Sequence, residues 1–126
     1  MPKFRAKKFS NSVYYALNGC RLSFKTQRNF RRHLLIALSC ILIAIILRLD
    51  LTSLCIVILA NSIPLVAEMF NSVCEFLVDL YYKNRWAKIA KMAKDIAAGA
   101  VLLSSCVSAI ITFLLCLNKI IYIFAS

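Results

Sequence analysis

Glycine and proline are scarce in this sequence, whose 126 residues include only two of each. Glycine supplies the unusual backbone conformations of tight turns, and proline fixes the backbone at turn positions. Their scarcity leaves little turn chemistry and no room for a glycine-rich loop. A fold built from many tight turns is therefore not expected.

Patterns typical of metal centres and disulfide frameworks are lacking as well. His33 is the single histidine, so no zinc-type ligand cluster can be drawn. None of the six cysteines forms a CxxC pair, and most of them fall in apolar segments. A free cysteine in such a segment behaves as a small hydrophobic residue.

Acidic residues are few: five Asp and Glu face sixteen Lys and Arg, and the net charge is +11. The basic residues gather before the first apolar run and again between Lys83 and Lys94. By the positive-inside rule, this predicts a cytoplasmic N-terminus, a cytoplasmic second loop and an external C-terminus. Anionic lipid accounts for the excess of basic residues, so nucleic-acid binding is not expected.

Apolar residues, in contrast, make up 62% of the chain. Long charge-free runs separated by short charged segments are typical of an all-α membrane protein, and they disfavour a soluble bundle with an unusually apolar core. We predict a single domain over residues 1–126. It has an amphipathic surface helix over about 10–32 and transmembrane helices over about 33–49, 51–80 and 90–120. The first apolar run follows a long basic segment, so no cleavable signal is expected.

The stretch EMFNSVCEFLVD breaks the apolar pattern with an acidic stripe, which we define as Glu68, Asn71, Glu75 and Asp79. At about 100° per residue, these four side chains share one narrow face of a helix. Carboxylates in a membrane segment are costly and mark a functional site by default. The alternative is a set of structural ion pairs with lysines of the second loop or with the N-terminal arginines.

Carboxylates close to the cytoplasmic interface, with cations nearby, are the parts of a metal-assisted phosphoryl-transfer site. The sequence has no GxxxxGK[ST] loop and no HRD or DFG element, which excludes the designs of soluble kinases. An ion-coupled transporter would use similar residues. It would need them nearer the bilayer midplane, with more spans or an internal repeat.

A stripe of small residues marks the start of the third span and predicts close packing against another helix. A protein of three spans cannot easily enclose a polar stripe alone, so we expect an oligomer. The small residues are Ala90, Ala93, Ala97, Ala100 and Ser104.

Three longer motifs are spread over most of the chain. ExxNSxxExxxD runs from Glu68 to Asp79, AKxAKDxAAGAVL from Ala90 to Leu102, and YxxxGxRxxF from Tyr15 to Phe24. They resemble the small bacterial membrane kinases, namely the prokaryotic diacylglycerol kinases and undecaprenol kinase. The resemblance implies a homotrimer in the bacterial cytoplasmic (inner) membrane that transfers phosphate from MgATP to a lipid hydroxyl. Diacylglycerol, converted to phosphatidic acid, is the first acceptor, and undecaprenol, converted to undecaprenyl phosphate, is the alternative. A non-catalytic membrane protein on the same fold is the alternative of another class.

The resemblance also implies roles for individual residues. Glu68 corresponds to the catalytic base for the lipid hydroxyl, and Asn71 to a residue that supports it. Glu75 corresponds to a metal ligand, and Gln27 stands where many relatives have a second metal-binding glutamate. The amide of Gln27 can coordinate magnesium but brings no negative charge. The residues implied in nucleotide binding are Tyr15, Gln27, Glu75, Lys94 and Asp95. The loop between Asp79 and Asp95 is one residue longer than in the best-known diacylglycerol kinase, so nucleotide contacts are not assigned to Asn84–Trp86.

Overall fold

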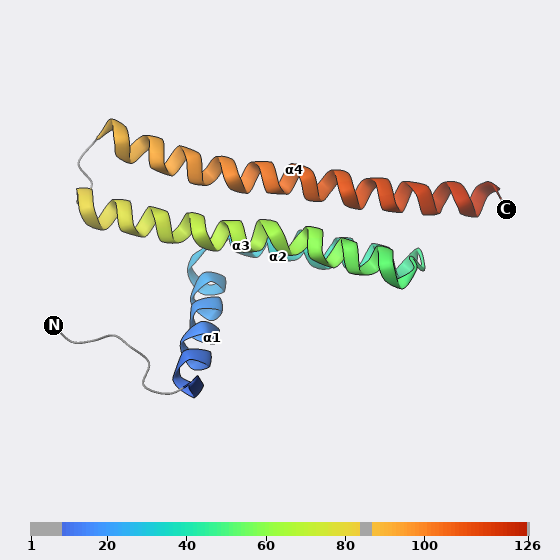
Figure 1. Ribbon diagram of the computed structural model, residues 1–126, viewed down its shortest axis with the longest axis horizontal. Helices are drawn as coiled ribbons and strands as arrows, with labels where there is room; N and C mark the ends of the chain where they lie inside the picture. Colours follow the sequence, from blue (N-terminus) through green and yellow to red (C-terminus); the bar gives the residue numbers. More distant parts are fainter. Residues whose placement is uncertain (1–8, 84–86, 126) are drawn as a thin grey trace.

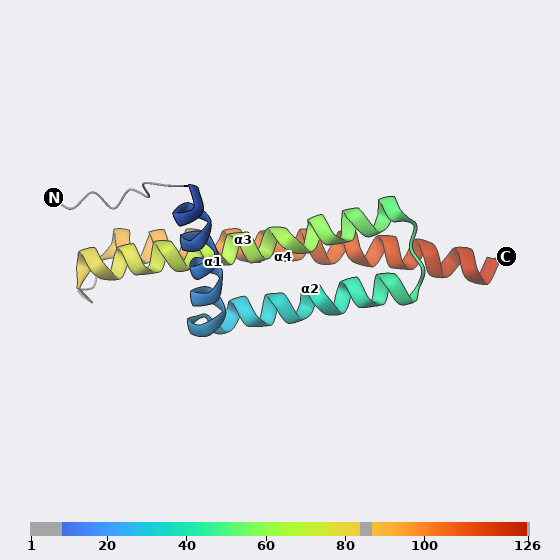
Figure 2. The same cartoon turned by 90° about the horizontal axis from the view of Figure 1, so that it is seen from below.

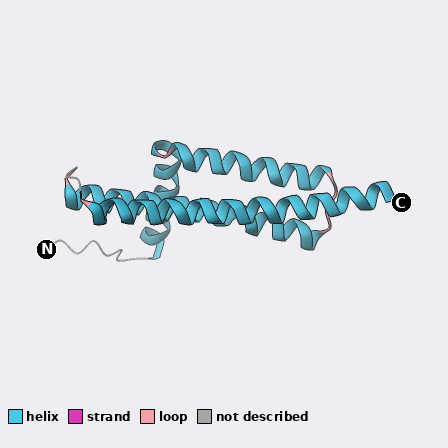
Figure 3. Ribbon diagram, turned by 90° about the horizontal axis from the view of Figure 1, so that it is seen from above, coloured by secondary structure: helices cyan, strands magenta, loops and turns pink. Residues whose placement is uncertain are grey.

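The protein is described by a computed structural model that covers residues 9–83 and 87–125, so Asn84–Trp86 lie outside the described residues. The described residues form four helices joined by short connections: α1 (Phe9–Thr26), α2 (Arg28–Ile46), α3 (Leu51–Tyr82) and α4 (Lys88–Ala125). Figure 3 shows helices and loops and no strand in this part of the chain. The all-α fold class predicted from the sequence is confirmed.

Three of the helices are long and apolar enough to cross a membrane. They are α2, α3 and α4, with 19, 32 and 38 residues. At about 1.5 Å per residue, α3 and α4 exceed the roughly 30 Å thickness of the hydrocarbon core. Their ends therefore extend beyond it, and the molecule is a membrane protein.

The three long helices run side by side, and α1 runs across their direction from the start of α2, on the side away from α4 (Figures 1 and 2). Successive long helices are antiparallel, because each follows the previous one through a short connection. α3 packs against both α2 and α4, and α1 contacts α2. The crossing lies part of the way along α3, so the C-terminal end of α3 and the N-terminal end of α4 extend past α1 (Figure 1).

The first helical segment differs from the sequence prediction. One helix was expected over about 10–32, but α1 ends at Thr26 and α2 begins at Arg28, with Gln27 in an extended conformation (φ −102°, ψ 110°). The Arg31 guanidinium donates hydrogen bonds to the carbonyl oxygens of Phe24 (2.8 Å) and Lys25 (3.0 Å). These bonds place a positive charge on the negative end of the α1 dipole. A single extended residue thus turns the chain from the crossing helix into the first span.

The connection between α2 and α3 is longer than predicted, because α2 ends at Ile46 and not at about residue 49, and Arg48 adopts a positive φ of 54°. Asp50 caps α3 by accepting hydrogen bonds from the Ser53 hydroxyl (2.7 Å) and the Ser53 backbone N–H (3.1 Å). The same bonds hold the pKa of the Asp50 carboxyl below its usual value. α3 therefore begins at a defined residue.

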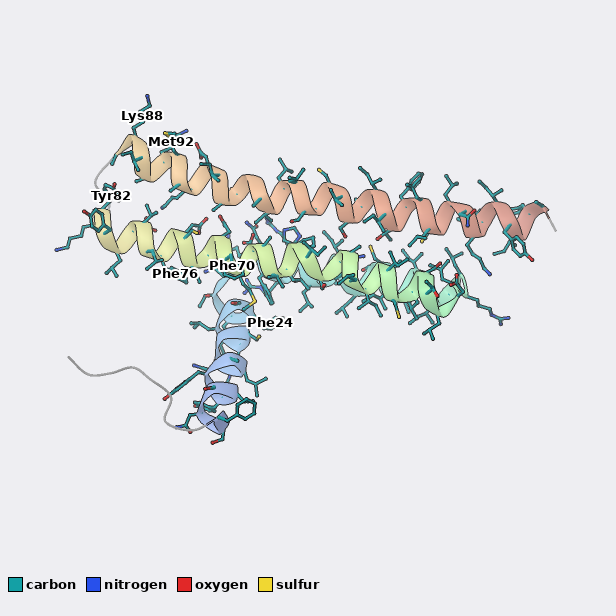
Figure 4. All side chains as sticks on the ribbon, viewed as in Figure 1. Phe24, Phe70, Phe76, Tyr82, Lys88 and Met92 are labelled. Atoms are coloured by element: carbon teal, nitrogen blue, oxygen red, sulfur yellow. The ribbon has the colours of Figure 1, made fainter. Side chains whose placement is uncertain are left out.

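Side chains at the contact between α3 and α4 are small or polar. Asn61 donates through Nδ2 to the Thr112 hydroxyl (3.0 Å) and to the Val57 carbonyl oxygen (2.9 Å). Small residues allow two helices to approach closely, and this contact then ties them together. The large apolar side chains point outward along the helices (Figure 4), as lipid-facing residues would. The buried apolar residues in the described ranges are Ala37, Ala44, Val57, Ala60, Ala90 and Val101.

Candidate active site

The acidic stripe lies on α3, and its burial changes along the helix. Glu68 and Asn71 are 3% and 6% exposed, Glu75 is half-buried, and Asp79 is exposed. In Figure 4, Phe70 lies near the crossing with α1, while Phe76 and Tyr82 lie progressively further past it. The stripe therefore runs from the packed region around the crossing to the end of α3 that extends beyond α1.

The buried part of the stripe is held by local contacts. Asn71 Nδ2 donates to Glu75 Oε1 at 3.1 Å, and the Ser72 hydroxyl donates to the Glu68 backbone oxygen at 2.9 Å. The Asn29 side chain, in the first turn of α2, interacts with the Glu68 carboxyl group. Asn29 was not singled out from the sequence, because its relation to Glu68 depends on how α2 packs against α3.

Asn71 Oδ1 is buried and has no hydrogen-bond partner among the described residues. Buried polar atoms of native proteins almost always have a partner, which can be ordered water or a bound molecule. The orphaned oxygen lies on the same face as the Glu68 carboxyl. This part of the stripe can therefore accept a hydrogen bond from a group that is not protein.

Among the described residues, ion pairs occur only at the outer end of the α3–α4 pair, near the connection between the two helices. Lys94 Nζ lies 2.6 Å from Asp79 Oδ1, and Lys91 Nζ lies 2.9 Å from Asp95 Oδ2 within α4. The ion-pair interpretation of the stripe thus holds for Asp79. Within residues 9–83 and 87–125, neither glutamate of the stripe has a cation within ion-pairing distance. In the part of the chain that the structure describes, Glu68 and Glu75 thus have no ion-pair partner.

Gln27 lies between α1 and α2, at the edge of the stripe. It lines a cavity of about 230 Å³ together with Gly19 on α1 and Ser72 and Phe76 on α3. Glu75 does not line this cavity, so the structure of one chain does not join the two predicted metal ligands in a single pocket. Tyr15 on α1 is 60% exposed, and its ring packs edge-on against that of Tyr14.

The donor atoms of the predicted magnesium ligands are oxygens, which are the ligands that Mg²⁺ prefers. The described residues contain no group of three or more His, Cys, Asp or Glu side chains arranged to hold a metal ion. Mg²⁺ is commonly held by one or two carboxylates plus substrate phosphates. By donor chemistry, the Glu75 carboxylate and the Gln27 amide are compatible with that sparse pattern, although the structure of one chain does not place them in one pocket.

Comparison with known proteins gives consistent matches. The family described as "Prokaryotic diacylglycerol kinase" matches residues 14–116. A diacylglycerol kinase of Synechocystis sp. is 36% identical over 100 residues, which cover 79% of this chain and 57% of that protein. An undecaprenol kinase of Bacillus subtilis is 31% identical over 113 residues, covering 90% of this chain and 91% of the relative. A diacylglycerol kinase of Helicobacter pylori is 30% identical over 97 residues, covering 77% and 75%.

These matches include the whole acidic stripe and the start of α4, and they agree with the three spans of the structure. The chain spans a little more than half the length of the Synechocystis relative and most of the other two. Both names, diacylglycerol kinase and undecaprenol kinase, describe lipid kinases. The chain therefore belongs to the prokaryotic diacylglycerol kinase family.

Proposed function

We propose that this protein is an ATP-dependent lipid kinase that phosphorylates the hydroxyl of diacylglycerol to give phosphatidic acid. The observation that carries this proposal is the acidic stripe, with a buried, unneutralised Glu68 at one end and the exposed Lys94–Asp79 pair at the other. A lipid hydroxyl in the packed region needs a base that takes up its proton. The phosphates of ATP, which arrives from water, need cations that neutralise their charge.

The position of α1 indicates how deep the two ends of the acidic stripe lie relative to the membrane surface. α1 carries both basic and apolar residues, as suits a helix lying in the membrane surface. Glu68 then lies near the height of that surface. Glu75 is two turns further out, about 10 Å along the axis. The stripe would thus run from the headgroup of a lipid to a nucleotide in the water.

Each residue of the stripe has one role in this proposal. Glu68 accepts the proton of the lipid hydroxyl, and the hydroxyl oxygen attacks the terminal phosphorus of ATP. The bond from that phosphorus to the bridging oxygen breaks, and ADP leaves. Asn71 supports the site by donating from Nδ2 to Glu75, and its orphaned Oδ1 is a further acceptor beside Glu68. Glu75 and Gln27 would hold magnesium, which neutralises phosphate charge when it is bound.

The start of α4 and the exposed part of α1 supply the nucleotide contacts. An ammonium group has three N–H donors, so Lys94 can keep its contact with Asp79 and still reach a phosphate. Asp95 and Tyr15 complete the proposed nucleotide-binding set. Asp95 is held within α4 by Lys91, and the exposed ring of Tyr15 can stack on a base.

We further propose a homotrimer in the bacterial inner membrane, with the N-terminus in the cytoplasm. Along α4, Ala90 is buried against α3, whereas Ala97 is half-buried and Ala100 is exposed. A cavity of about 320 Å³ beside Ala100 is lined by α3 and α4. This small-residue face suits close approach of another chain. Native mass spectrometry of the detergent-solubilised protein would count the chains.

The experiment that tests the proposal is a labelled-ATP assay with purified protein in mixed micelles, offering diacylglycerol and undecaprenol separately. We expect labelled phosphatidic acid. Undecaprenol remains the second candidate, since the B. subtilis relative matches over most of both chains. If undecaprenyl phosphate were the only labelled product, the acceptor would be undecaprenol and not diacylglycerol. No labelled lipid from either acceptor would favour the non-catalytic alternative.

A further inference from the structure

A cavity that the proposed phosphoryl transfer does not use lies among α2, α3 and α4. It measures about 270 Å³, and its lining includes His33, Cys40, Asn61, Pro64, Ser105 and Ser108. This volume is just below the usual range of small-molecule sites, about 300–1,000 Å³. The cavity is mostly apolar with a few polar groups, which is the usual character of a ligand site. It suits part of a lipid molecule.

The position of the cavity follows from the pairing of α3 and α4. Asn61 contacts Thr112, so the residues two turns further along α3 and two turns back along α4 lie at about the same height. These residues are Glu68 and Ser105. The cavity therefore begins at about the height of Glu68 and extends to Asn61, roughly 10 Å further into the membrane-spanning part.

Two polar groups in the cavity lining have no partner within residues 9–83 and 87–125. The Ser108 side chain is 5% exposed, and its hydroxyl makes no hydrogen bond. The His33 imidazole also makes none. Ser105, in contrast, donates its hydroxyl to the Val101 carbonyl oxygen at 2.7 Å. The cavity thus offers two unused hydrogen-bond donors just below the height of the proposed base.

We propose that this cavity binds the ester-linked glycerol region of the acceptor lipid, with the Ser108 hydroxyl and the His33 N–H as donors to its acyl carbonyl oxygens. The inference rests on the proposed lipid-kinase function and deepens it. In diacylglycerol the ester carbonyls follow directly behind the reacting hydroxyl. In a polyprenol only hydrocarbon follows, and it would cover both donors without satisfying them, which is unfavourable. The cavity therefore selects an acyl glycerol over a polyprenol.

The test compares diacylglycerol with its dialkyl ether analogue, which keeps the hydroxyl and both chains but lacks the carbonyl oxygens. We expect kcat/KM for the ester to exceed that for the ether about tenfold in the wild-type protein, because the ether cannot accept hydrogen bonds from the buried Ser108 and the half-buried His33. Ser108→Ala lowers this ratio to about twofold. Ser105→Ala is the matched control, because that hydroxyl is already used within α4, and it keeps the wild-type ratio.

Three results would overturn the proposal: equal activity on ester and ether in the wild-type protein, a polyprenol preferred to both, or a Ser108→Ala ratio like that of the wild type. The last would mean that Ser108 has only a structural role. Failure of the proposed function looks different, with no phosphorylated product from any lipid. In that case the cavity proposal is tested by equilibrium binding of radiolabelled diacylglycerol and its ether analogue to the purified protein. The ester should then bind about tenfold more tightly than the ether.

Discussion

The two ends of the α3–α4 pair are joined in different ways. At the inner end, within the membrane-spanning part, the contact is a neutral, buried hydrogen bond of 3.0 Å from Asn61 to Thr112. At the outer end it is charged and partly exposed, from Lys94 to Asp79 at 2.6 Å. A buried polar contact leaves an orphaned group when it is broken, whereas water can replace an exposed ion pair. We therefore expect the inner contact to stay intact, whereas the outer ion pair can break at a small cost in free energy.

This difference matches the chemistry proposed for the two ends. A lipid must be held in a fixed position beside Glu68, which requires a rigid frame on the membrane side. A nucleotide must enter and leave from water, and so must reach Lys94 without a large rearrangement. The predictions below test whether the two contacts differ in this way.

The largest effect is expected at the inner contact. Asn61→Leu leaves the Thr112 hydroxyl without its partner and should lower the free energy of unfolding by about 1 kcal/mol. Unfolding of the detergent-solubilised protein by increasing SDS measures this change. Ser62→Ala is the control, because the Ser62 hydroxyl donates to the Leu59 carbonyl oxygen of its own helix and, among the described residues, to no other helix. If the two variants were equally stable, the contact between Asn61 and Thr112 would not stabilise the fold.

An intermediate effect is expected at Gln27, where α1 meets α2 beside the stripe. If the amide joins Glu75 in the magnesium shell, Gln27→Glu adds a charged ligand, and half-maximal activity should need severalfold less magnesium. Attraction to the nearby divalent ion outweighs repulsion from the phosphates only while the ion is bound. ATP without magnesium should therefore bind more weakly. Activity curves against magnesium that superimpose for both proteins would place Gln27 outside the metal site.

The smallest effect is expected at the outer contact. Asp79→Asn should change the free energy of unfolding by less than about 1 kcal/mol, because the pair is partly exposed. Freed from Asp79, Lys94 should bind phosphate better, so KM for MgATP falls about two- to fivefold. Asp50→Asn makes the same substitution at the other end of α3, where Asn also caps well, and should leave KM unchanged. A raised KM in Asp79→Asn would instead assign Asp79 to nucleotide binding.

The sequence predicted the three spans because their apolar runs are local signals. It also predicted the stripe, because its four residues recur at helical spacing. The break at Gln27 could not be predicted, since the amphipathic pattern continues on both sides of it. The contact of Asn61 with Thr112 joins residues far apart in the chain, and no local pattern carries it. The same holds for the approach of Asn29 to Glu68.

The central claim is that Glu68, which lies between the two contacts, is the base for a lipid hydroxyl while the nucleotide binds further out along the stripe. The most direct measurement is turnover and MgATP affinity of Glu68→Gln in the same preparation. The amide keeps the shape of the side chain but cannot accept the proton, so turnover should fall by about 100-fold or more, with MgATP affinity within about twofold of the wild type. Turnover close to that of the wild-type protein would contradict the account.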